Sequence, residues 1–508
     1  MRRLLILTVF AIFTAVVCTT SCVHKPQSLV VAPNGGFPDS IGNIFLAKCT
    51  NSGCHNQASY TNAGGLLLDT WQHMLQGSVS GAVVVAYNTQ LSPLLYYCNA
   101  YDSSDILAND AGHLTTPLTL SQYMTLKRWV AAGAPDRNGN IPFATNPDTR
   151  QKIYLTISGC NLIAVIDAQS HVIMRYIKVG TYPGNEYLHD VTVSGDGMYA
   201  YVSFLDNNLL QKIDTRADTV IGAANLTSAV AGVYGTGGWS IINLSPQDTA
   251  LMVSGFLATG YEVTINTNSL LINNNLSADA HTAGTSEFAY PHGIASNATF
   301  DTFFATLEYG NVINKFSFAP EFTYKYISLD GNPPIAAKSA TSPDPHQIQM
   351  SPDYSKYFVS CQNSNEVRVM DAYKDTLIKA IPVGAFPQEM AISRSKGYLF
   401  VVCMQDSNAH TPSGAKGCVT IIDYNTLHVV TTLYGDFYQP HDVCVDEQDG
   451  LIYICSTNSN PSGPPPHHVL GNCSGRDGWY TVYNLNTLVM YNNRYGVPVF
   501  PYAISNRF

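Results

Sequence analysis

One strand pattern recurs six times between residues 188 and 460, and this repeat limits the fold more than any other feature of the sequence. Each unit contains an apolar strand, a turn near Asp or Gly, a second alternating strand, a third strand and usually a fourth. The units begin with LHDVTVS at 188, GWSIINL at 238, PHGIASN at 291, PHQIQMS at 345, PQEMAIS at 387 and PHDVCVD at 440. Their starts lie 42 to 54 residues apart. Four short strands in a repeat of this length are typical of one blade of a β-propeller.

The two ends of the repeat region complete a seventh unit. The segment that begins with KIYLTISG at 152 supplies strands two to four of a unit but has no first strand, whereas the C-terminal FPYAISNRF is a lone first strand. Pairing the two segments closes the ring and leaves no strand edge exposed. We therefore expect a mainly β protein in which residues 152–508 form a seven-bladed propeller, closed by the C-terminal strand.

The second strands of these units carry a family resemblance. Tyr201-Val202-Ser203 and Phe358-Val359-Ser360 are similar to the strands that give the YVTN family of seven-bladed propellers its name. The resemblance extends over nearly all of residues 152–508 and implies the same propeller fold for this region.

The first strands place one residue of each unit toward a common axis, because the first strands of a propeller line its central channel. By alignment these residues are His189, Trp239, His292, His346, Gln388, His441 and Tyr502. Four imidazoles that converge near one mouth of the channel suit copper or zinc, since imidazole is a ligand for both metals. The alternative is a structural role, in which each imidazole hydrogen-bonds the backbone of a neighbouring blade. Both interpretations stay open.

Residues 39–136 have a different pattern, with two helical segments around a loop-rich middle. In DSIGNIFLAKCTNSGCHN, Ile41, Ile44 and Phe45 recur at helical spacing. In LTLSQYMTLKRWVAAGAPD an amphipathic helix ends at Gly133, with Pro135 beyond it. Residues 137–151 are rich in Asn and Pro and are expected to form a linker to the propeller.

The stretch CTNSGCH, residues 49–55, closes the first helix of this small domain. Haem c attachment needs two thiols and an imidazole directly after the second thiol, which Cys49, Cys54 and His55 provide. Four residues separate the cysteines instead of the usual two, and Gly53 gives the loop the freedom to bulge. A disulfide between the two cysteines is one alternative. A zinc site is another, but zinc needs further ligands and no second close-spaced pair follows.

Three stretches around this motif resemble the cytochrome c domains of exported planctomycete and Bacteroidetes proteins. They are Gly64-Gly65-Leu66, Ser92-Pro93-Leu94-Leu95 and the WVAAGA at residues 129–134. The resemblance covers about residues 39–136 and implies one covalent haem c, with thioethers at Cys49 and Cys54 and His55 as the proximal iron ligand.

The same resemblance raises the question of the sixth iron ligand. Members of this family commonly have a Met-Pro pair before the last helix, but this sequence has GHLTTPLTLSQ there, without a methionine. His113 is the nearest residue able to bind iron and is therefore the candidate sixth ligand; an open sixth position is the alternative. Met74 and Met124 are fallback ligands, although both fit the buried face of a helix.

The N-terminus, MRRLLILTVFAIFTAVVCTTSC, predicts export. Two arginines, a short apolar run and small residues make a secretory signal, and the run is too short and wrongly flanked for a membrane span. The residues before Cys22 resemble a bacterial lipobox, except that Thr19 stands where Leu is usual, so the resemblance implies acylation of Cys22; secretion with an unmodified Cys22 is the alternative. We expect residues 1–22 to be a signal, residues 23–38 a tether, and the mature protein a lipid-anchored protein of the periplasm or cell surface.

Four further cysteines lie at the bases of two hairpin insertions. Cys403 and Cys418 flank one insertion, and Cys455 and Cys473 flank the other. Export permits disulfides, so we predict one at each base, where it would close a flexible loop. Buried free thiols are the alternative for both pairs.

Charge and motifs limit the function classes. Charged residues make up only 12% of the chain, and the net charge of −10 has no basic block, so nucleic acid is not an expected partner. No Ser-His-Asp order, phosphate loop or carboxylate pair stands out, and catalytic residues stay unknown.

Three functions remain. In the first, a haem c domain transfers electrons to or from a redox partner protein, and the propeller docks a partner or ligand. In the second, the protein is an oxidoreductase whose reaction centre is built on His189, His292, His346 and His441 in the channel, with electrons passing through the haem. In the third, the propeller is a binding scaffold and the cytochrome is vestigial.

Overall fold

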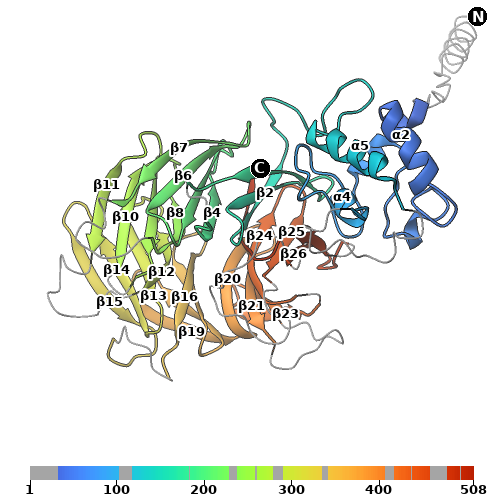
Figure 1. Cartoon of the computed structure of the whole chain (residues 1–508). Helices are drawn as coiled ribbons and strands as arrows, with labels where there is room; N and C mark the ends of the chain where they lie inside the picture. The colour runs from blue at the N-terminus through green and yellow to red at the C-terminus, as the bar shows by residue number, and fades with distance from the viewer. Residues whose placement is uncertain are drawn as a thin grey trace, which may run out of the picture.

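Seven antiparallel sheets of four strands each form a closed ring in the computed structural model of the chain (Figure 1). The structure describes residues 33–101, 117–181, 184–227, 237–257, 260–277, 290–334, 341–406, 417–435, 437–457, 478–491 and 494–507. The prediction of a mainly β, seven-bladed propeller is confirmed.

The blades follow one another along the chain, each running from an inner strand to an outer one. Blade 1 contains β4 (Leu188–Val193), β5 (Tyr199–Phe204), β6 (Leu209–Asp214) and β7 (Thr219–Asn225), and blade 2 contains β8 (Trp239–Leu244), β9 (Ala250–Gly255), β10 (Tyr261–Asn266) and β11 (Ile272–Ser277). Blade 3 contains β12 (Pro291–Ser296), β13 (Thr302–Leu307), β14 (Val312–Ser317) and β15 (Thr323–Ser328), and blade 4 contains β16 (Pro345–Met350), β17 (Lys356–Cys361), β18 (Glu366–Asp371) and β19 (Thr376–Pro382). Blade 5 contains β20 (Ala385–Ser393), β21 (Tyr398–Gln405), β22 (Cys418–Asp423) and β23 (His428–Leu433), and blade 6 contains β24 (Pro440–Asp446), β25 (Leu451–Ser456), β26 (Gly478–Asn484) and β27 (Tyr495–Val497).

Blade 7 closes the ring from both ends of the repeat region, as predicted. It is made of β28 (Pro501–Arg507) followed by β1 (Lys152–Ile157), β2 (Leu162–Asp167) and β3 (Ile173–Lys178). β28 pairs antiparallel with β1, from Lys152 opposite Arg507 to Ile157 opposite Pro501. Because the ring is closed, the inner strand of every blade lies between the inner strands of the two neighbouring blades.

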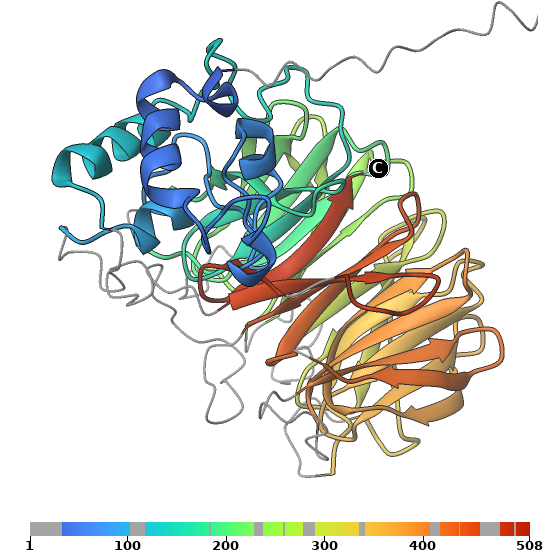
Figure 2. The same cartoon turned by 90° about the vertical axis from the view of Figure 1, so that its right-hand side faces the viewer.

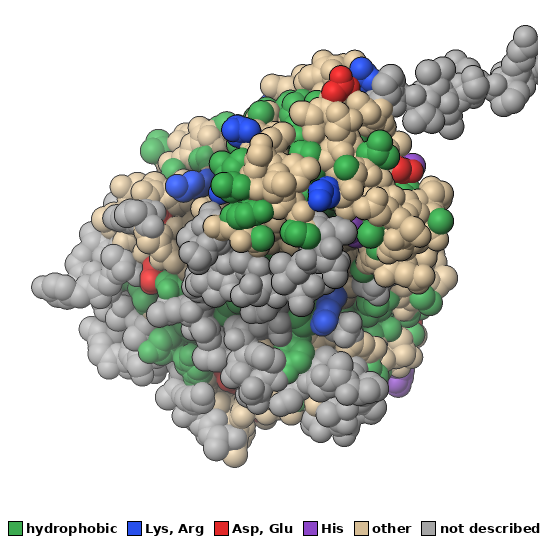
Figure 3. Space-filling view, turned by 45° about the vertical axis from the view of Figure 1, so that its right-hand side comes forward, with side chains coloured by type: hydrophobic (Ala, Val, Ile, Leu, Met, Phe, Trp, Pro, Cys, Tyr) green, Lys and Arg blue, Asp and Glu red, His purple; other side chains and the backbone are tan. Residues whose placement is uncertain are grey.

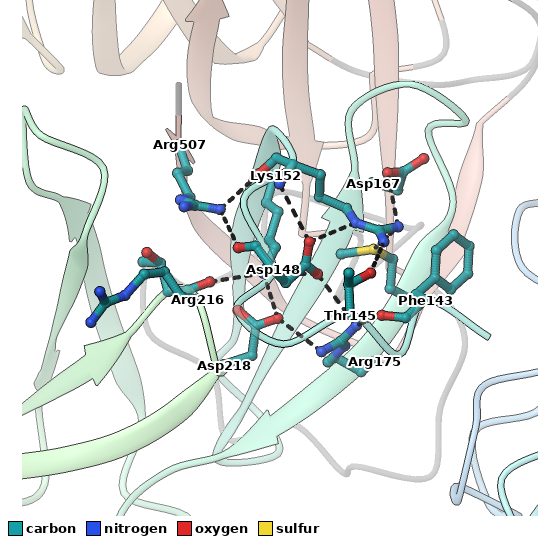
Figure 4. Close-up of polar contacts among 12 residues, drawn as sticks. Phe143, Thr145, Asp148, Lys152, Asp167, Arg175, Arg216, Asp218 and Arg507 are labelled. Carbon is teal, nitrogen blue, oxygen red and sulfur yellow. Dashed lines mark hydrogen bonds and ion pairs between the residues drawn. The ribbon is translucent and has the colours of Figure 1, made fainter. Parts of the chain in front are cut away.

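A buried ion network reinforces this closure (Figure 4). The Lys152 ammonium is fully buried, 2.8 Å from Asp218 Oδ2 and 3.2 Å from Asp148 Oδ2. The Arg507 guanidinium donates to the backbone carbonyls of Asp148 and Arg150 at 2.7 and 2.9 Å. These contacts connect the end of the linker, β1 and the C-terminal strand β28 to blade 1.

Burial follows the radius of the ring. All six residues of β1 and all six of β12 are buried, whereas the outer strands β19 and β23 expose apolar residues such as Leu377, Ile378 and Val430. The main cores lie between neighbouring blades, where the apolar faces of two sheets meet. The inner strands are therefore mostly buried, although some of their polar residues, such as Thr192, Asn243 and Gln347, are partly exposed.

Short helices make up the part of the chain before the propeller. They are the 3-10 turn η1 (Pro33–Gly36), α2 (Asp39–Ile44), the π-helical turn η2 (Phe45–Cys49), η3 (Tyr60–Asn62), α3 (Trp71–Leu75), α4 (Pro93–Tyr97) and α5 (Leu120–Ala131). Their core includes Phe37, Phe45 and Trp129, whose rings pack edge to face with centroids 4.8 to 6.1 Å apart. Both expected helices are present, since α2 and η2 cover residues 39–49 and α5 stops two residues before Gly133. Within the described residues, no helix has the length and apolar character needed to cross a bilayer.

This helical domain rests on blades 6 and 7 (Figures 1 and 2). Val85 belongs to the apolar cluster that contains Ile153 of β1 and Tyr453 of β25. The carbonyl of Ser80 accepts a hydrogen bond of 2.9 Å from the amide of Gly496 in β27. The domain is therefore fixed to the ring by apolar and backbone contacts.

On the face drawn in Figure 3, Lys and Arg side chains lie singly among apolar and polar ones.

Candidate functional site

The inner strand of every blade carries a bulge at the same place. In blade 3, Pro291 pairs with Leu307 and Ile294 pairs with Ala305, so two inner-strand residues lie opposite Thr306 alone. The same irregularity interrupts the inner strands of five other blades. In blade 6 the bulge lies between Pro440 and Asp442, with His441 as the extra residue. A bulge breaks the strict alternation of side chains and re-aims them. Two consecutive residues of each inner strand can therefore contribute polar groups to the channel region.

Hydroxyl groups on the second strands hold these bulges in place. Thr306 accepts from the Gly293 amide at 2.7 Å and donates to the His346 carbonyl of the next blade at 2.7 Å. Ser203 accepts from the Asp190 amide at 3.1 Å and donates to the Ser240 carbonyl at 2.5 Å. The backbone groups freed by the bulge are satisfied by hydroxyls that also join one blade to the next.

The strand register corrects one member of the expected ring of channel residues. Trp239 pairs with Gly255 just as Pro291 pairs with Leu307, so Trp239 occupies the position of the opening Pro. Its ring lies in the apolar cluster between blades 1 and 2, and Ser240 takes the channel position instead. The sequence alignment was wrong here by one residue, because this blade has neither the Pro nor the His that marks the position elsewhere. The ring residues are therefore His189, Ser240, His292, His346, Gln388, His441 and Tyr502, all of which are buried.

The four histidines do converge. The Nε2 atoms of His189 and His292 lie 3.2 Å apart, and the ring centroids of His292 and His346 lie 4.1 Å apart. The ring of His441 lies 6.1 Å from that of His346 and 3.6 Å from that of Tyr502. His292 Nδ1 donates to the His346 carbonyl at 3.3 Å, and His441 Nδ1 donates to the Tyr502 carbonyl at 3.1 Å. The predicted structural role, in which an imidazole hydrogen-bonds the backbone of a neighbouring blade, therefore holds for Nδ1 of His292 and of His441. The other ring nitrogen of His292, Nε2, faces His189.

Carboxylates stand among these imidazoles, and sequence reasoning did not find them. Glu308 Oε1 lies 3.5 Å from His346 Nε2 and 3.9 Å from His292 Nε2. Glu389 Oε1 lies 3.6 Å from His346 Nδ1. Glu389 directly follows the ring residue Gln388 in the sequence. The repeat alignment could therefore have pointed to Glu389 as an acidic residue near the channel. Glu308 follows the second strand of blade 3, where no repeat alignment points to it.

Two more buried acids in the channel have a structural partner each. Asp190 Oδ2 accepts from the Ile242 amide, and Asp442 Oδ2 accepts from the Ile504 amide, both at 2.8 Å and both across a blade boundary. Burial raises the pKa of Asp190 to about 6. Burial also raises the pKa of Asp442, and the nearby charge of Asp190 adds to the shift, which brings the pKa of Asp442 to about 8. Burial, with the charges of Asp442 and Asp190 adding to it, also raises the pKa of Glu389 well above its usual range.

A cavity of about 150 Å³ opens beside the ring. Its lining includes His189, Asp190, Glu389, His441 and Asp442, and none of the described residues that line it is Lys or Arg. Imidazole and carboxylate groups without a cationic side chain can hold a metal ion or exchange protons with a small polar molecule.

The CTNSGCH stretch, residues 49–55, for which the sequence predicts haem attachment, forms a closed loop at the end of η2. The His55 amide donates to the Cys49 carbonyl at 3.0 Å, and the Ser59 hydroxyl donates to the Cys54 carbonyl at 2.6 Å. Gly53 has a φ of 83°, with nothing within 4 Å of where a Cβ would stand, so the widened loop uses the freedom expected of glycine. His55 Nδ1 lies 3.3 Å from the Leu66 carbonyl. Because a carbonyl only accepts, Nδ1 carries the proton and Nε2 carries the lone pair of the neutral ring.

These residues fit a haem c group and fit the two alternatives less well. A histidine that binds a metal usually donates its other ring N–H to a carbonyl or carboxylate, as His55 does. Cys49 and Cys54 are both free and half-buried, so the alternative of a disulfide between them is not present. Cys98 packs near Cys49, but the described residues of this domain contain no three metal-binding atoms within 4.8 Å of one another. Burial raises the pKa of Cys49 to about 12 and that of Cys98 to about 11.

The structure answers part of the question of the sixth iron ligand. His113 lies outside the described residues, as do Cys22 and the export signal. Met74 is buried in the core of the helical domain, which fits a packing residue. Met124 was expected on a buried helix face and is instead 37% exposed on α5.

Neither predicted disulfide is present in the structure, where Cys403, Cys418 and Cys455 are free thiols. Cys455 lies in the core between blades 6 and 7, and its Sγ points at the Tyr502 carbonyl 3.2 Å away instead of toward the insertion that ends at Cys473. Cys473 lies outside the described residues. Cys160 is disulfide-bonded, and none of the other described cysteines is its partner.

No protein-family model matches the chain, and no curated protein matches it. Solved structures with a similar arrangement include a protein of unknown function from Desulfotomaculum acetoxidans, 12% identical with a TM-score of 0.48, where the match covers 70% of this chain and 100% of that one. Another is the dihydro-heme d1 dehydrogenase NirN in complex with DHE, 13% identical with a TM-score of 0.45, covering 84% and 94%. A third is the hydrazine synthase of Kuenenia stuttgartiensis, 14% identical with a TM-score of 0.46, covering 64% and 93%. Likenesses this distant carry no argument about function, and the expected membership of the cytochrome c and YVTN families stays a prediction.

Proposed function

We propose that this protein is an extracytoplasmic electron-transfer protein with one covalent haem c on its helical domain. In this proposal Cys49 and Cys54 form the thioethers and His55 binds the iron. The observation that carries it is the orientation of His55, which follows Cys54 directly and donates from Nδ1 to the Leu66 carbonyl at 3.3 Å. With the proton on Nδ1, Nε2 carries the lone pair that would bind the iron, and the hydrogen bond raises the basicity of that nitrogen. The haem supplies a reversible one-electron couple.

The rest of the chain has a supporting role in this proposal. The wide loop around Gly53 would hold Cys49, Cys54 and His55 for the haem. The propeller, to which the helical domain is fixed through Ser80 and Val85, offers a broad surface for docking a redox partner protein. Export and a lipid anchor at Cys22 would hold the protein at a membrane surface, and His113 is the candidate sixth ligand. An oxidised spectrum that contains the weak far-red band of methionine ligation would exclude His113.

The test is covalent haem retention by the full exported chain, produced together with a cytochrome c maturation system. The wild type is expected to keep a haem stain through a denaturing gel. Cys54→Ala and Cys49→Ala each remove one thioether and should weaken the stain, and the double variant should lose it. Cys98→Ala is the matched control, because Cys98 packs near Cys49 but lies outside the motif. A wild type without covalent haem, or a double variant that keeps it, contradicts the proposal.

A second candidate, an oxidoreductase with its reaction centre in the channel, is favoured by one observation. The cavity beside the histidine ring is large enough for a small molecule and is lined by His189 and His441. Rapid electron exchange between the haem and a centre in the channel would favour this candidate over simple electron transfer. A protein that takes up no haem would favour the third function, a binding scaffold.

A further inference from the structure

The strongest unassigned site is a cluster of three side chains in the channel. We propose that His292, His346 and Glu308 bind one divalent first-row transition-metal ion, with His189 as a fourth ligand. One ligand atom from each of the first three residues lies within 4.8 Å of the other two, and all three residues are buried. Among the described residues this is the only such group of His, Cys, Asp or Glu side chains.

The distances suit a metal ion. Two ligand atoms on a tetrahedral ion, with bonds of about 2.1 Å, lie about 3.4 Å apart. Glu308 Oε1 lies 3.5 Å from His346 Nε2 and 3.9 Å from His292 Nε2, and His292 Nε2 lies 3.2 Å from His189 Nε2. Glu308 Oε1 and His346 Nε2 already lie at the separation that one ion requires, and a movement of about half an ångström brings Glu308 Oε1 and His292 Nε2 to it. His189 lies outside this group of three and reaches the same ion only by a further movement of its side chain.

The orientation of the imidazoles points the same way. His292 donates from Nδ1 to the backbone carbonyl of His346, so its Nε2 carries the lone pair and faces His189 and Glu308. His346 directs Nε2 at Glu308 and has the Glu389 carboxylate 3.6 Å behind its Nδ1. A carbonyl or carboxylate behind each ligating imidazole is the usual outer shell of a protein metal site.

Charge supplies an independent argument. Glu308 and Glu389 are both buried beside His346, with Glu308 Oε1 3.5 Å from its Nε2 and Glu389 Oε1 3.6 Å from its Nδ1. A buried carboxylate needs a cation or must take up a proton. A divalent ion between Glu308 and the imidazoles provides that charge. Two imidazoles with one carboxylate suit Zn²⁺, Fe²⁺ and Cu²⁺ better than Mg²⁺ or Ca²⁺, which prefer oxygen ligands.

The cavity fixes where a further ligand of the ion would enter. His189 contacts His292 of the cluster and also lines the cavity, whereas His292, His346 and Glu308 are not among the residues that line it. The ion would thus be enclosed by blades 3 and 4 on one side and reached past His189 on the other. Because these four side chains already complete a tetrahedral site, a further ligand on that side would displace His189 or raise the coordination number to five.

The test measures metal content in the full exported protein, purified without a metal-chelating tag, with haem iron counted separately. The wild type is expected to hold about one equivalent of transition metal, or to bind one equivalent of Zn²⁺ after treatment with a chelator. Glu308→Gln and His346→Gln should weaken Zn²⁺ binding by at least about tenfold in calorimetry. His441→Gln is the matched control, since it is equally buried in the same ring and should bind as the wild type does.

Two further measurements protect the test against misfolding and against confusion with the haem. Co²⁺ bound to the wild type should show the visible absorption of a low-coordinate site, which needs no variant. The variant Cys49→Ala/Cys54→Ala, which lacks the haem thiols, should keep the channel metal. The proposal is overturned if the loaded wild type binds less than about a tenth of an equivalent of Zn²⁺ or Co²⁺, or if folded Glu308→Gln binds Zn²⁺ as the wild type does. The His189–His292 contact would then be a hydrogen-bonded imidazole pair.

Discussion

At the scale of the single residue, Glu262 is a buried acid away from the channel ring. Its side chain is fully buried on β10, and its two carboxylate oxygens lie 3.0 and 3.1 Å from the Ser254 hydroxyl. Burial raises the pKa of Glu262 well above its usual range, and the Ser254 hydrogen bond offsets only part of this. The folded state therefore binds a proton at Glu262 that the unfolded state releases near pH 4.

This proton makes stability depend on pH in a predictable direction. Because the pKa is raised on folding, the contribution of Glu262 is fully present below about pH 4.3 and is lost as pH rises toward the folded value. Glu262→Gln, which cannot ionise, should therefore gain stability relative to the wild type between pH 5 and pH 8, by roughly 1–3 kcal/mol. Urea midpoints at the two pH values measure this. Glu321→Gln, at an exposed position, should show the same change in stability with pH as the wild type. The prediction is contradicted if the stability of Glu262→Gln also changes with pH just as that of the wild type does.

At the scale of the element, the strand pair β21 and β22 carries two thiols at directly opposite positions. Cys403 pairs with Cys418 in the register, and an added Cβ on Gly384 would approach both sulfurs. Opposite residues of an antiparallel pair have Cα atoms about 4.5–5.5 Å apart, which is within the range for a disulfide. The two strands therefore need little movement to form the bond.

Mild oxidation of the folded protein is expected to link Cys403 to Cys418 and to raise stability by about 3 kcal/mol, because the bond closes the insertion between the strands. Non-reducing peptide mapping and a thermal melt measure the two effects. Cys361, a buried thiol of β17, should stay free under the same conditions. A linked peptide that contains Cys361, or unlinked Cys403 after oxidation, would contradict this expectation.

Elements were also what the sequence predicted best. The six repeats place the inner strands correctly, because alternating apolar strands and turn residues recur at a spacing that only a blade satisfies. Single residues were less predictable. The sequence alignment assigned Trp239 to the channel position, which Ser240 occupies. The bulge that defines this position has no sequence signal in a blade that lacks both the Pro and the His. Glu308 was missed because it follows the end of β13, outside the inner strands that carry the histidines. Only the packing of blade 3 against blade 4 brings the Glu308 carboxylate close to His346.

At the scale of the whole molecule, the ring is closed by strand pairing and by a group of buried charges. Lys152 lies at the start of β1, with Asp148 on the linker and Asp218 on the β6–β7 turn of blade 1 as its acidic partners (Figure 4). The same Asp218 accepts from the Tyr154 hydroxyl at 2.7 Å. A neutral residue at position 152 would leave two carboxylates with one cation fewer at the seam where the first and last strands of the ring meet.

Lys152→Met is therefore expected to destabilise the protein by about 3–5 kcal/mol, the usual result of removing one partner of a buried ion pair. Asp218→Asn in the same chain should recover part of this loss, because it removes one of the stranded charges. Urea midpoints of the two single variants and the double variant measure the coupling. The control is Lys325→Met: Lys325 lies 2.9 Å from Asp375 but is 60% exposed, so its loss should cost less than about 1 kcal/mol. Equal effects at positions 152 and 325, or no recovery in the double variant, would show that the buried charges do not hold the ring closed.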